Sequence, residues 1–369
     1  MTPELKAAIA ARLERARQAL IQRGWQAMWL GQSTNLRYLS GVVEKPSERL
    51  FGAFIPAEGE PMMVVPRLYH DEMQELSAIG AVRSWTDEEG MASAVRRWFD
   101  LPPGSTVAVD PLLHAAFLFL FQEELPQVQF TSAGELLGQM RLYKDEYEKG
   151  CLRTAGKIAD AVMAEITSRS PAGRTEREVA AEIERLFEEH GSEGVSFPPI
   201  ASAGPNAAFP HHMPDGTVIQ PGQCLVLDFG GVYQGYASDM TRTIFAGDPP
   251  AEMRRVYEVV QAAQQYAVEH LKPGMPAEAA DALARQCIVD AGYGNAFIHR
   301  LGHGIGLDVH EAPYLVAGNP VELKPGVAFS VEPGVYVTGL GGVRIEDIVL
   351  MNEDGPERVN HVPRELLAL

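Results

Sequence analysis

The chain has few cysteines, an excess of acidic over basic residues, and no long hydrophobic run. Its three cysteines, Cys151, Cys224 and Cys287, lie far apart and form no CxxC pair. They are expected to be reduced core thiols in a cytoplasmic protein rather than disulfides. The apolar run 115–121 is too short to span a bilayer. The N-terminal residues 1–6 contain no apolar signal core, so nothing predicts export.

Positive charge is scarce as well. The chain carries 31 Lys and Arg against 49 Asp and Glu, which gives a formal charge of −18. Nucleic-acid binding depends on clustered basic residues, so this balance argues against a nucleic-acid partner. It argues equally against docking on an anionic membrane. The simplest consequence of the charge is solubility.

Length and pattern predict two domains. A chain of 369 residues with 46% hydrophobic residues can form more than one core. Residues 1–140 alternate helical and strand-like stretches, as expected of a small α/β domain, although 35–41 is predicted to be a turn. A charged stretch at 141–146 opens a long helix, and strands with Gly/Pro loops follow Gly191. We therefore predict an N-terminal domain over 1–140 and a second domain over 141–369.

Local signals define several helices. An amphipathic helix is predicted over 5–23, ending at Gly24. Thr175 and Glu178 have the spacing of a capping box. Two further helices are predicted over 251–271 and 277–291.

The second half of the chain contains four carboxylates and one histidine in glycine-rich, strand-like settings. They are Asp228, Asp239, His303, Glu332 and Glu346. Buried carboxylates must be paired with a cation or bound to a metal, and few basic residues lie between them. The economical explanation is a site for divalent metal ions.

Spacing suggests how these acids meet. A reversal at Tyr233–Gln234 would place Asp228 opposite Asp239 on a β-hairpin, with the side chains roughly 5 Å apart. Glu332 and Glu346 would repeat this arrangement about a turn near 339–341. The segments 228–235 and 332–339 also resemble each other faintly, which suggests a duplicated αβ unit.

Two metals fit this donor set better than one. Two ions about 3.5–4 Å apart can share bridging carboxylates and a water. Oxygen donors with one imidazole suit Mn²⁺ or Co²⁺, with Zn²⁺ as a third candidate. The spacing of His299 and His303 superficially resembles the helical zinc motif. However, the glutamate of that motif is missing and glycines surround His303, so a strand or loop is expected, with His299 behind the ligand.

Further side chains are candidates for supporting roles. His211 and His310 could donate hydrogen bonds or carry protons at the rim of a metal site. Arg344 could orient Glu346, two residues along the strand. Tyr336 either bonds a metal-bound group or packs in the core.

Together these segments resemble a known family. The motifs are Ser202–Ala207 with Pro210–His212, Leu227–Gly230, Ser238–Thr243, Gly302–Glu311, Val331–Tyr336 and Gly342–Asp347. They are similar to those of the pita-bread metallopeptidases, namely the Xaa-Pro dipeptidases (prolidases) and aminopeptidase P. The resemblance implies an α+β fold. A curved antiparallel sheet with flanking helices and an internal duplication would follow an N-terminal creatinase-like α/β domain.

The resemblance also implies a role for each residue. Asp228 would chelate one metal, Asp239 and Glu346 would bridge both, and His303 and Glu332 would hold the other. The two cations would lower the pKa of the attacking water, and Glu332 would take its proton. His211 and His310 would stabilise the tetrahedral intermediate. His299, Arg344 and Tyr336 would support the ligands from behind.

The expected substrates are short proline-containing peptides, and a homodimer is expected. The loop 311–319 lacks the arginine with which some relatives bind a substrate carboxylate. An aminopeptidase acting on longer peptides is therefore the main alternative to a dipeptidase. A non-peptidase enzyme on the same fold, such as a creatinase or lyase, is remoter, because creatinases lack the metal ligands. A binding module is expected to have lost ligands, and methionine aminopeptidases normally lack the large N-terminal domain.

Overall fold

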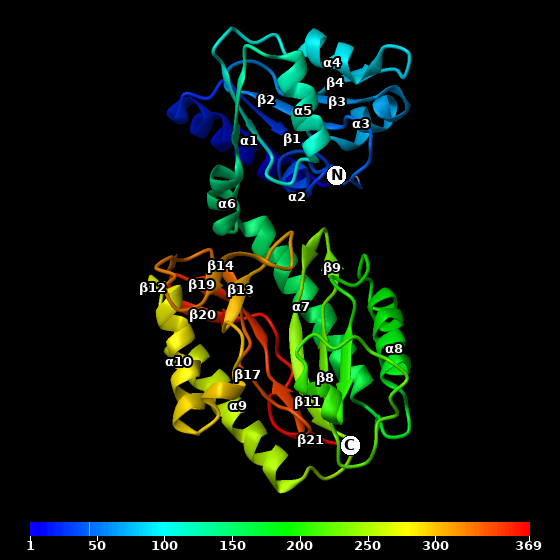
Figure 1. Cartoon of the computed structure of the whole chain (residues 1–369), viewed down its shortest axis with the longest axis vertical. Coiled ribbons are helices and arrows are strands. Elements are labelled where there is room, and N and C mark those ends of the chain that lie inside the picture. Colours follow the sequence, from blue (N-terminus) through cyan, green and yellow to red (C-terminus); the bar gives the residue numbers. More distant parts are fainter. Residues whose placement is uncertain (44) are drawn as a thin grey trace. The chain divides into compact units, whose positions relative to one another are not determined.

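A mixed six-stranded sheet organises the first part of the chain. The structure, a computed structural model, describes residues 1–43 and 45–369. It divides into two units, Met1–Arg141 and Leu142–Leu369 (Figure 1). In the first unit the strand order is β4-β3-β2-β1-β5-β6. Its strands are β1 (Ala27–Leu30), β2 (Gly52–Pro56), β3 (Met62–Pro66), β4 (Ala81–Trp85), β5 (Thr106–Val109) and β6 (Gln129–Ser132). Its helices are α1 (Pro3–Arg23), α2 (Thr34–Ser40), α3 (His70–Leu76), α4 (Gly90–Trp98), α5 (Ala115–Glu124) and α6 (Gly134–Leu142).

Two local predictions for this unit had different outcomes. The N-terminal helix is confirmed, because α1 ends at Gly24, whose φ of 68° closes the helix in the left-handed conformation. The prediction of a turn over 35–41 is wrong, because these residues lie mainly in α2. The Ser33 side chain caps this helix by accepting hydrogen bonds from two backbone N–H groups. A capped turn of seven residues is too short to be recognised from periodicity.

The second unit contains two mainly antiparallel sheets, with strand orders β21-β11-β8-β7 and β14-β13-β16-β19-β20. The first is built by β7 (Ile200–Ala203), β8 (Cys224–Phe229), β11 (Met240–Phe245) and β21 (Leu367–Ala368). The second is built by β13 (Gly302–Gly304), β14 (Glu311–Leu315), β16 (Ala328–Val331), β19 (Asp347–Asn352) and β20 (Gly355–Arg358). Paired short strands are β9 (Val232–Tyr233) with β10 (Tyr236–Ala237), β12 (Met275–Pro276) with β15 (Glu322–Leu323), and β17 (Gly334–Val337) with β18 (Gly341–Arg344).

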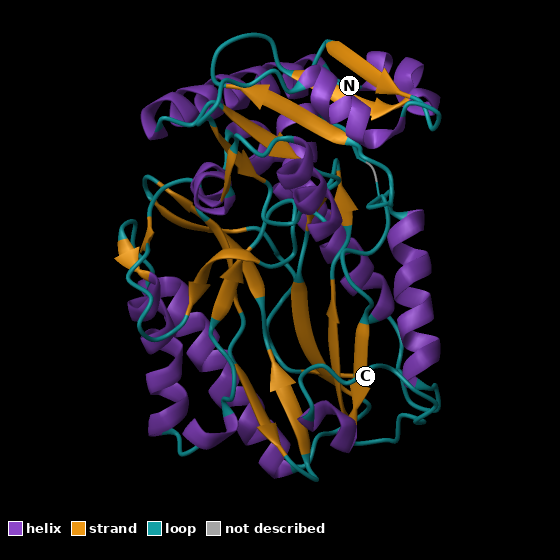
Figure 2. Cartoon of the chain, turned by 45° about the horizontal axis from the view of Figure 1, so that its top comes forward, coloured by secondary structure: helices purple, strands orange, loops and turns teal. Residues whose placement is uncertain are grey.

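Each sheet is accompanied by a pair of helices, which are α7 (Glu146–Ile166), α8 (Glu176–Glu189), α9 (Ala251–His270) and α10 (Ala277–Asp290). Val162 of α7 and Leu186 of α8 belong to one buried cluster with Leu225 of β8. Val260 of α9 and Ala284 of α10 belong to another. Helices therefore flank the strands on both sides (Figure 2). This arrangement confirms the predicted α+β fold, with an antiparallel core between helices.

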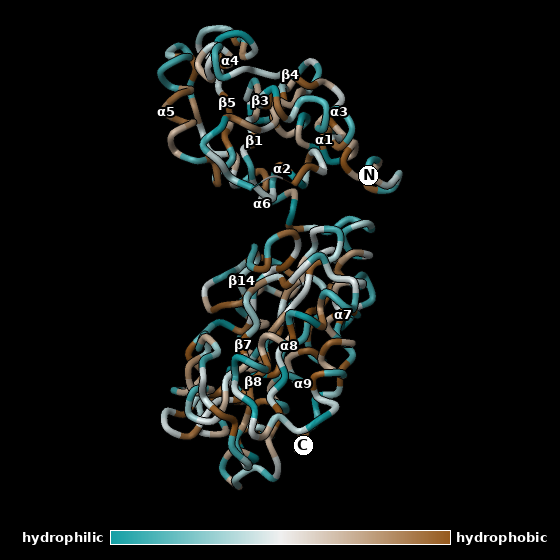
Figure 3. Tube along the Cα trace, turned by 90° about the vertical axis from the view of Figure 1, so that its right-hand side faces the viewer, coloured by the Kyte–Doolittle hydropathy of each residue, from teal (hydrophilic) through white to brown (hydrophobic). Residues whose placement is uncertain are grey.

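Side-chain polarity follows this layering. Hydrophobic and hydrophilic residues alternate along the trace within each unit (Figure 3). In β8, Leu225 and Leu227 face the cluster of α7 and α8, whereas Cys224 and Val226 face that of α9 and α10. Because successive strand residues point to opposite faces, Asp228 points to the same side as Cys224 and Val226. Among the described residues, no helix combines the length and apolarity that a membrane span requires.

Candidate metal centre

All five predicted metal ligands line one cavity of about 850 Å³ in the second unit. Asp228 lies in β8 and His303 in β13, whereas Asp239, Glu332 and Glu346 lie in the short connections just before β11, β17 and β19. Donor atoms of Asp239, His303 and Glu346 lie within 4.8 Å of one another. Strands of both sheets therefore bring residues that are up to 118 positions apart in sequence to one point.

The predicted partner of Asp228 is wrong. Asp228 pairs with Thr241 rather than Asp239 in the antiparallel ladder of β8 and β11. The hairpin turns at Gln234–Gly235, whose φ angles of 49° and 80° are both positive. A two-residue turn with two left-handed residues matches the twist of the strands. It reverses the chain one residue later than expected, which moves every cross-strand partner by two.

The second predicted hairpin is confirmed. Val331 pairs with Asp347, and Gly334 pairs with Arg344. Both pairings share one register, and that register places Glu332 opposite Glu346 between them. Glu332 thus lies between β16 and β17, and Glu346 lies between β18 and β19.

Three carboxylate oxygens at the centre have no hydrogen-bond partner among the described residues. They belong to Asp228 (Oδ1), Asp239 (Oδ1) and Glu346 (Oε1). Asp228, Asp239 and Glu346 are 8%, 4% and 1% exposed. Buried carboxylate oxygens are costly unless a proton, a hydrogen bond or a cation satisfies them. The donor set of oxygens with one imidazole therefore fits divalent cations.

Crowding of like charges changes the pKa values of these acids. Burial and the neighbouring carboxylates raise the pKa of Asp239 and that of Glu346 well above their ordinary values. Glu332 behaves differently. Burial raises its pKa, but the hydrogen bond and charge of His303 outweigh burial and bring it to about 2. Ionisation of Asp239 and Glu346 is therefore less favourable than that of an exposed carboxylate unless a cation lies beside them.

The imidazole of His303 is oriented as a ligand. Its Nδ1 lies 3.0 Å from the carbonyl oxygen of Gly304, to which it donates its proton. Nε2 is therefore the ring nitrogen that faces the acids of the centre. Nε2 lies 3.3 Å from Glu332 and 3.6 Å from Asp239. A Cβ atom at Gly302 would lie 1.9 Å from a backbone oxygen of Ser330, so this close strand packing requires the preceding glycine.

Arg344 does not contact Glu346, contrary to expectation. Its guanidinium bonds the Oδ2 atom of Asp228 and the hydroxyl of Thr241 at 3.1 Å. Thr241 in turn donates its hydroxyl proton to Glu346 over 2.7 Å. The arginine side chain points across to the neighbouring sheet, so it orients Asp228 directly and Glu346 only through Thr241.

His299 and Tyr336 extend this chain of contacts. Nδ1 of His299 donates to the carbonyl oxygen of Arg300 over 2.8 Å, and burial lowers the pKa of His299. The neutral ring therefore accepts the Tyr336 hydroxyl proton at Nε2, 3.0 Å away. Arg344 donates to the same hydroxyl oxygen over 2.6 Å. Burial raises the pKa of Tyr336 to about 12, so it stays protonated.

His211 and His310 lie on the walls of the cavity. Both residues are exposed. The ring of His310 packs edge-on against that of His303, with centroids 4.1 Å apart. Burial, then the neighbouring His303 and Arg300, lower the pKa of His310. Apolar residues complete the walls, which include Phe197, Ile200, Phe209, Pro210, Ile298 and Val309.

One buried acid supports the segment of His211 and was not predicted. Glu176, fully buried, accepts hydrogen bonds from the Ala203 backbone at 2.7 Å and from Asn206 at 3.1 Å. Its other oxygen lies 2.9 Å from Nε2 of His212. The capping box of Thr175 and Glu178, which is confirmed, explains the start of the helix without assigning a role to Glu176 between them. The only sequence signal was an acid at the first position of a helix.

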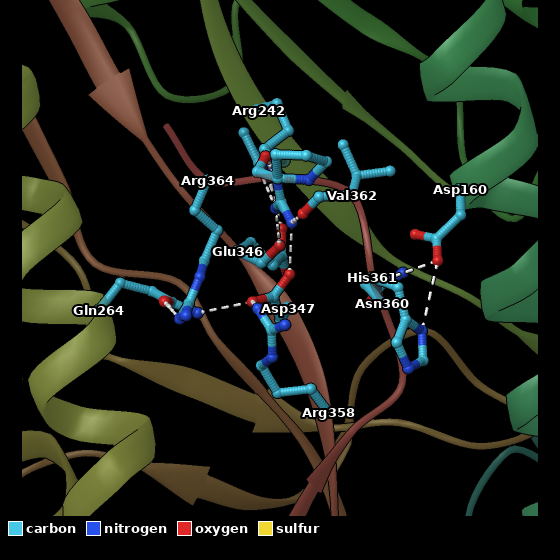
Figure 4. A network of polar contacts seen from close by, with 12 residues as sticks. Asp160, Arg242, Gln264, Glu346, Asp347, Arg358, Asn360, His361, Val362 and Arg364 are labelled. Atoms are coloured by element: carbon cyan, nitrogen blue, oxygen red, sulfur yellow. Dashed lines mark hydrogen bonds and ion pairs between the residues drawn. The ribbon is translucent and has the colours of Figure 1, made fainter. Parts of the chain in front are cut away.

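A second polar network, which includes Arg242, Gln264 and Asp347, supports the backbone of Glu346 (Figure 4). Arg242 donates to the Glu346 carbonyl oxygen and to the Asp347 carboxylate, each over 2.6 Å. Gln264 donates to the other Asp347 oxygen over 3.0 Å. These buried contacts fix the start of β19, and with it the position of Glu346.

The raised pKa values predict how cations affect stability. Asp239 and Glu346 have folded-state pKa values above their unfolded values of about 4. The metal-stripped protein therefore loses stability as pH rises from about 4 through those raised values. Glu332, with its pKa of about 2, stays ionised throughout pH 5–8. At pH 8, MnCl₂ at 100 times its Kd should raise Tm by about 5–10 °C. The same MnCl₂ concentration should raise Tm less at pH 5, because protons then compete with the cations for Asp239 and Glu346.

Thermal unfolding of chelator-treated protein at both pH values checks this expectation. NaCl at matched ionic strength is the control. An equal Tm shift at pH 5 and pH 8, or none at either, would contradict a cation site built on Asp239 and Glu346.

Models of known protein families match residues of both units. The model of metallopeptidase family M24 matches residues 150–353. The model of the creatinase/prolidase N-terminal domain matches residues 12–143. The curated Xaa-Pro dipeptidase of Lactobacillus delbrueckii subsp. lactis is 37% identical over 370 residues, which cover 97% of this chain and 98% of that protein.

Solved structures of prolidases and dipeptidases are similar to this chain over nearly its whole length. The prolidase from Thermococcus sibiricus has a TM-score of 0.92 at 35% identity, covering 97% of this chain and 98% of that one. The dipeptidase PepE from Mycobacterium ulcerans has a TM-score of 0.91 at 39% identity, covering 98% of each chain. Similarity therefore includes every element that contributes to the centre.

Proposed function

Because the chain belongs to metallopeptidase family M24, we propose that it is a two-metal hydrolase of Xaa-Pro bonds at the N-terminus of short peptides. Xaa-Pro dipeptides are the foremost substrates. The observation that carries the proposal is the set of three unpartnered carboxylate oxygens beside His303. The proposal assigns residues 1–140 to a creatinase-like domain and 141–369 to the catalytic domain.

Asp228, Asp239, His303, Glu332 and Glu346 would hold two divalent cations, with Mn²⁺ or Co²⁺ favoured over Zn²⁺ by the oxygen-rich donor set. Bound cations supply Lewis acidity, which polarises the scissile carbonyl and lowers the pKa of the attacking water. The family resemblance assigns Asp239 and Glu346 to both ions.

Protein side chains carry the remaining steps. Glu332, ionised and held by the Ser330 hydroxyl at 3.0 Å, accepts the proton of the attacking water. His211 and His310 donate hydrogen bonds to the carbonyl oxygen as negative charge develops on it. Arg344 holds Asp228 in place. Tyr336 and His299 in turn position Arg344 through the Tyr336 hydroxyl.

The apolar walls of the cavity support a proline preference. An Xaa-Pro amide has no N–H for a peptidase to bind, so the ring must be recognised by shape. Phe209 and Ile298 line the cavity and are 58% and 64% exposed. A proline ring would cover part of this apolar surface.

The second candidate is an Xaa-Pro aminopeptidase that accepts longer peptides. It is favoured by the loop 311–319, which contains no arginine. The two functions are separated by kcat/KM for Ala-Pro, Ala-Pro-Gly and Ala-Ala with Mn²⁺-loaded protein. We expect Ala-Pro to be cleaved at least about 10-fold more efficiently than the tripeptide. Comparable cleavage of the tripeptide would contradict a dipeptidase. Activity that survives complete chelation would contradict the metal mechanism.

The proposal includes a cytoplasmic homodimer. The Cys224 thiol supports a reducing compartment, since it is buried and forms no disulfide among the described residues. The dimer rests on the family resemblance alone.

A further inference from the structure

Arg300 is a cationic side chain of the cavity wall that is not committed to any acid. Two arginines line the cavity, Arg300 and Arg344. Arg344 is bonded to Asp228 and Tyr336. Within residues 1–43 and 45–369, the Arg300 guanidinium makes no hydrogen bond or ion pair. It lies over the Tyr314 ring, whose centroid is 4.2 Å from the guanidinium carbon.

The position of Arg300 limits what it can reach. Arg300 lies three positions before His303, so the two Cα atoms lie at most about 10 Å apart. Arg300 and His310 both line the cavity. The guanidinium therefore acts on the same cavity as the five metal ligands, near His310 on the wall.

Charge is distributed unequally over this cavity. Four carboxylates line it together with Arg300, whose positive charge is paired with no acid among the described residues. A free dipeptide has a carboxylate about 7 Å, or two residues, from its amino end. A guanidinium presents a planar fork that matches a carboxylate with two parallel hydrogen bonds.

Tyr314 prepares Arg300 for this contact. Stacking over an aromatic ring restricts the guanidinium while leaving its N–H groups free to donate in the plane. Side chains that are ordered before binding lose less entropy on binding. The ring belongs to β14, which pairs with β13 next to His303, so the stacked arginine is tied to the metal centre through the sheet.

We propose that Arg300 binds the C-terminal carboxylate of the substrate and thereby selects free dipeptides over longer peptides. This inference rests on the proposed function and identifies a specificity-determining residue for it. A peptide extended beyond proline has an amide where the carboxylate would be, and it offers the guanidinium no charge.

The test compares Ala-Pro with its C-terminal amide in wild-type protein, Arg300→Ala and Arg300→Lys. Losing a charge-assisted hydrogen bond should raise KM for Ala-Pro about 10- to 100-fold in Arg300→Ala, with kcat little changed. KM for the amide should stay the same. Arg300→Lys should fall between, because it keeps the charge but loses the fork. Arg254→Ala, an exposed arginine of α9, is the matched control and should resemble wild type.

Equal KM increases for Ala-Pro and its amide would overturn the proposal, because they would indicate general damage to the cavity. So would unchanged KM values in Arg300→Ala. Calorimetry with an Ala-Pro analogue whose peptide bond is reduced, and with its amide, provides a readout independent of turnover. If wild type hydrolyses no Xaa-Pro substrate, the proposed function fails. A preference for the carboxylate analogue that Arg300→Ala removes would still support this assignment, and no preference would overturn it.

Discussion

Asp239→Asn is expected to abolish metal binding and to lower kcat/KM for Ala-Pro by about 1,000-fold or more. The amide is nearly isosteric but neutral, so it would remove a ligand that we propose both ions share, and with it several kcal/mol of charge stabilisation. The metal-stripped variant should unfold at the same or a higher temperature than metal-stripped wild type. Burial and three neighbouring carboxylates raise the pKa of Asp239, and the substitution relieves that repulsion.

Metal content, steady-state kinetics and thermal unfolding of the stripped proteins measure these effects together. Asp248→Asn is the control, because Asp248 is an exposed aspartate beyond the other end of β11. Stoichiometric metal with normal turnover in Asp239→Asn would remove Asp239 from the centre. His303→Ala should lose metal and activity similarly. Asp228→Ala should lose them too, but at a cost in stability, because it leaves Arg344 buried without its acid.

His211→Ala is expected to keep both metals and to lose most turnover. His211 lines the cavity but lies on an exposed segment outside the five-ligand cluster. Removing one hydrogen-bond donor to a developing oxyanion typically lowers kcat about 100- to 1,000-fold. KM should change little, since the lost contact strengthens only in the transition state.

The matched control for His211→Ala is His270→Ala, an exposed histidine at the end of α9. Metal analysis must accompany the kinetics, because loss of metal in His211→Ala would explain a slow enzyme without any catalytic role. Turnover within about 3-fold of wild type, with metals bound, would remove His211 from the mechanism.

Much of this protein is encoded in short stretches of sequence. The capping box of Thr175 and Glu178 and the left-handed Gly24 depend on residues within one helical turn. The glycines around His303 exclude a helix for the same local reason. A buried acid at the end of an apolar strand, such as Asp228, signals a required cation because burying charge is costly. These rules predict local elements and the identity of the donors, whereas the α+β fold was expected from the family resemblance.

Partners distant in sequence required the folded structure. Arg344 bonds Asp228 across 116 positions, and Glu176 holds His212 across 36. Neither pair is predictable from spacing, because sheet packing decides which side chains face each other. The register of the first hairpin depended on a turn displaced by one residue.

The ligand types and their order along the chain follow from residue chemistry, which does not depend on distant contacts. Whether the ligands face one point, which arginine each acid meets and where Arg300 lies in the cavity are three-dimensional properties. They depend on how two sheets pack, and that packing is determined by the burial of whole faces rather than by any single motif.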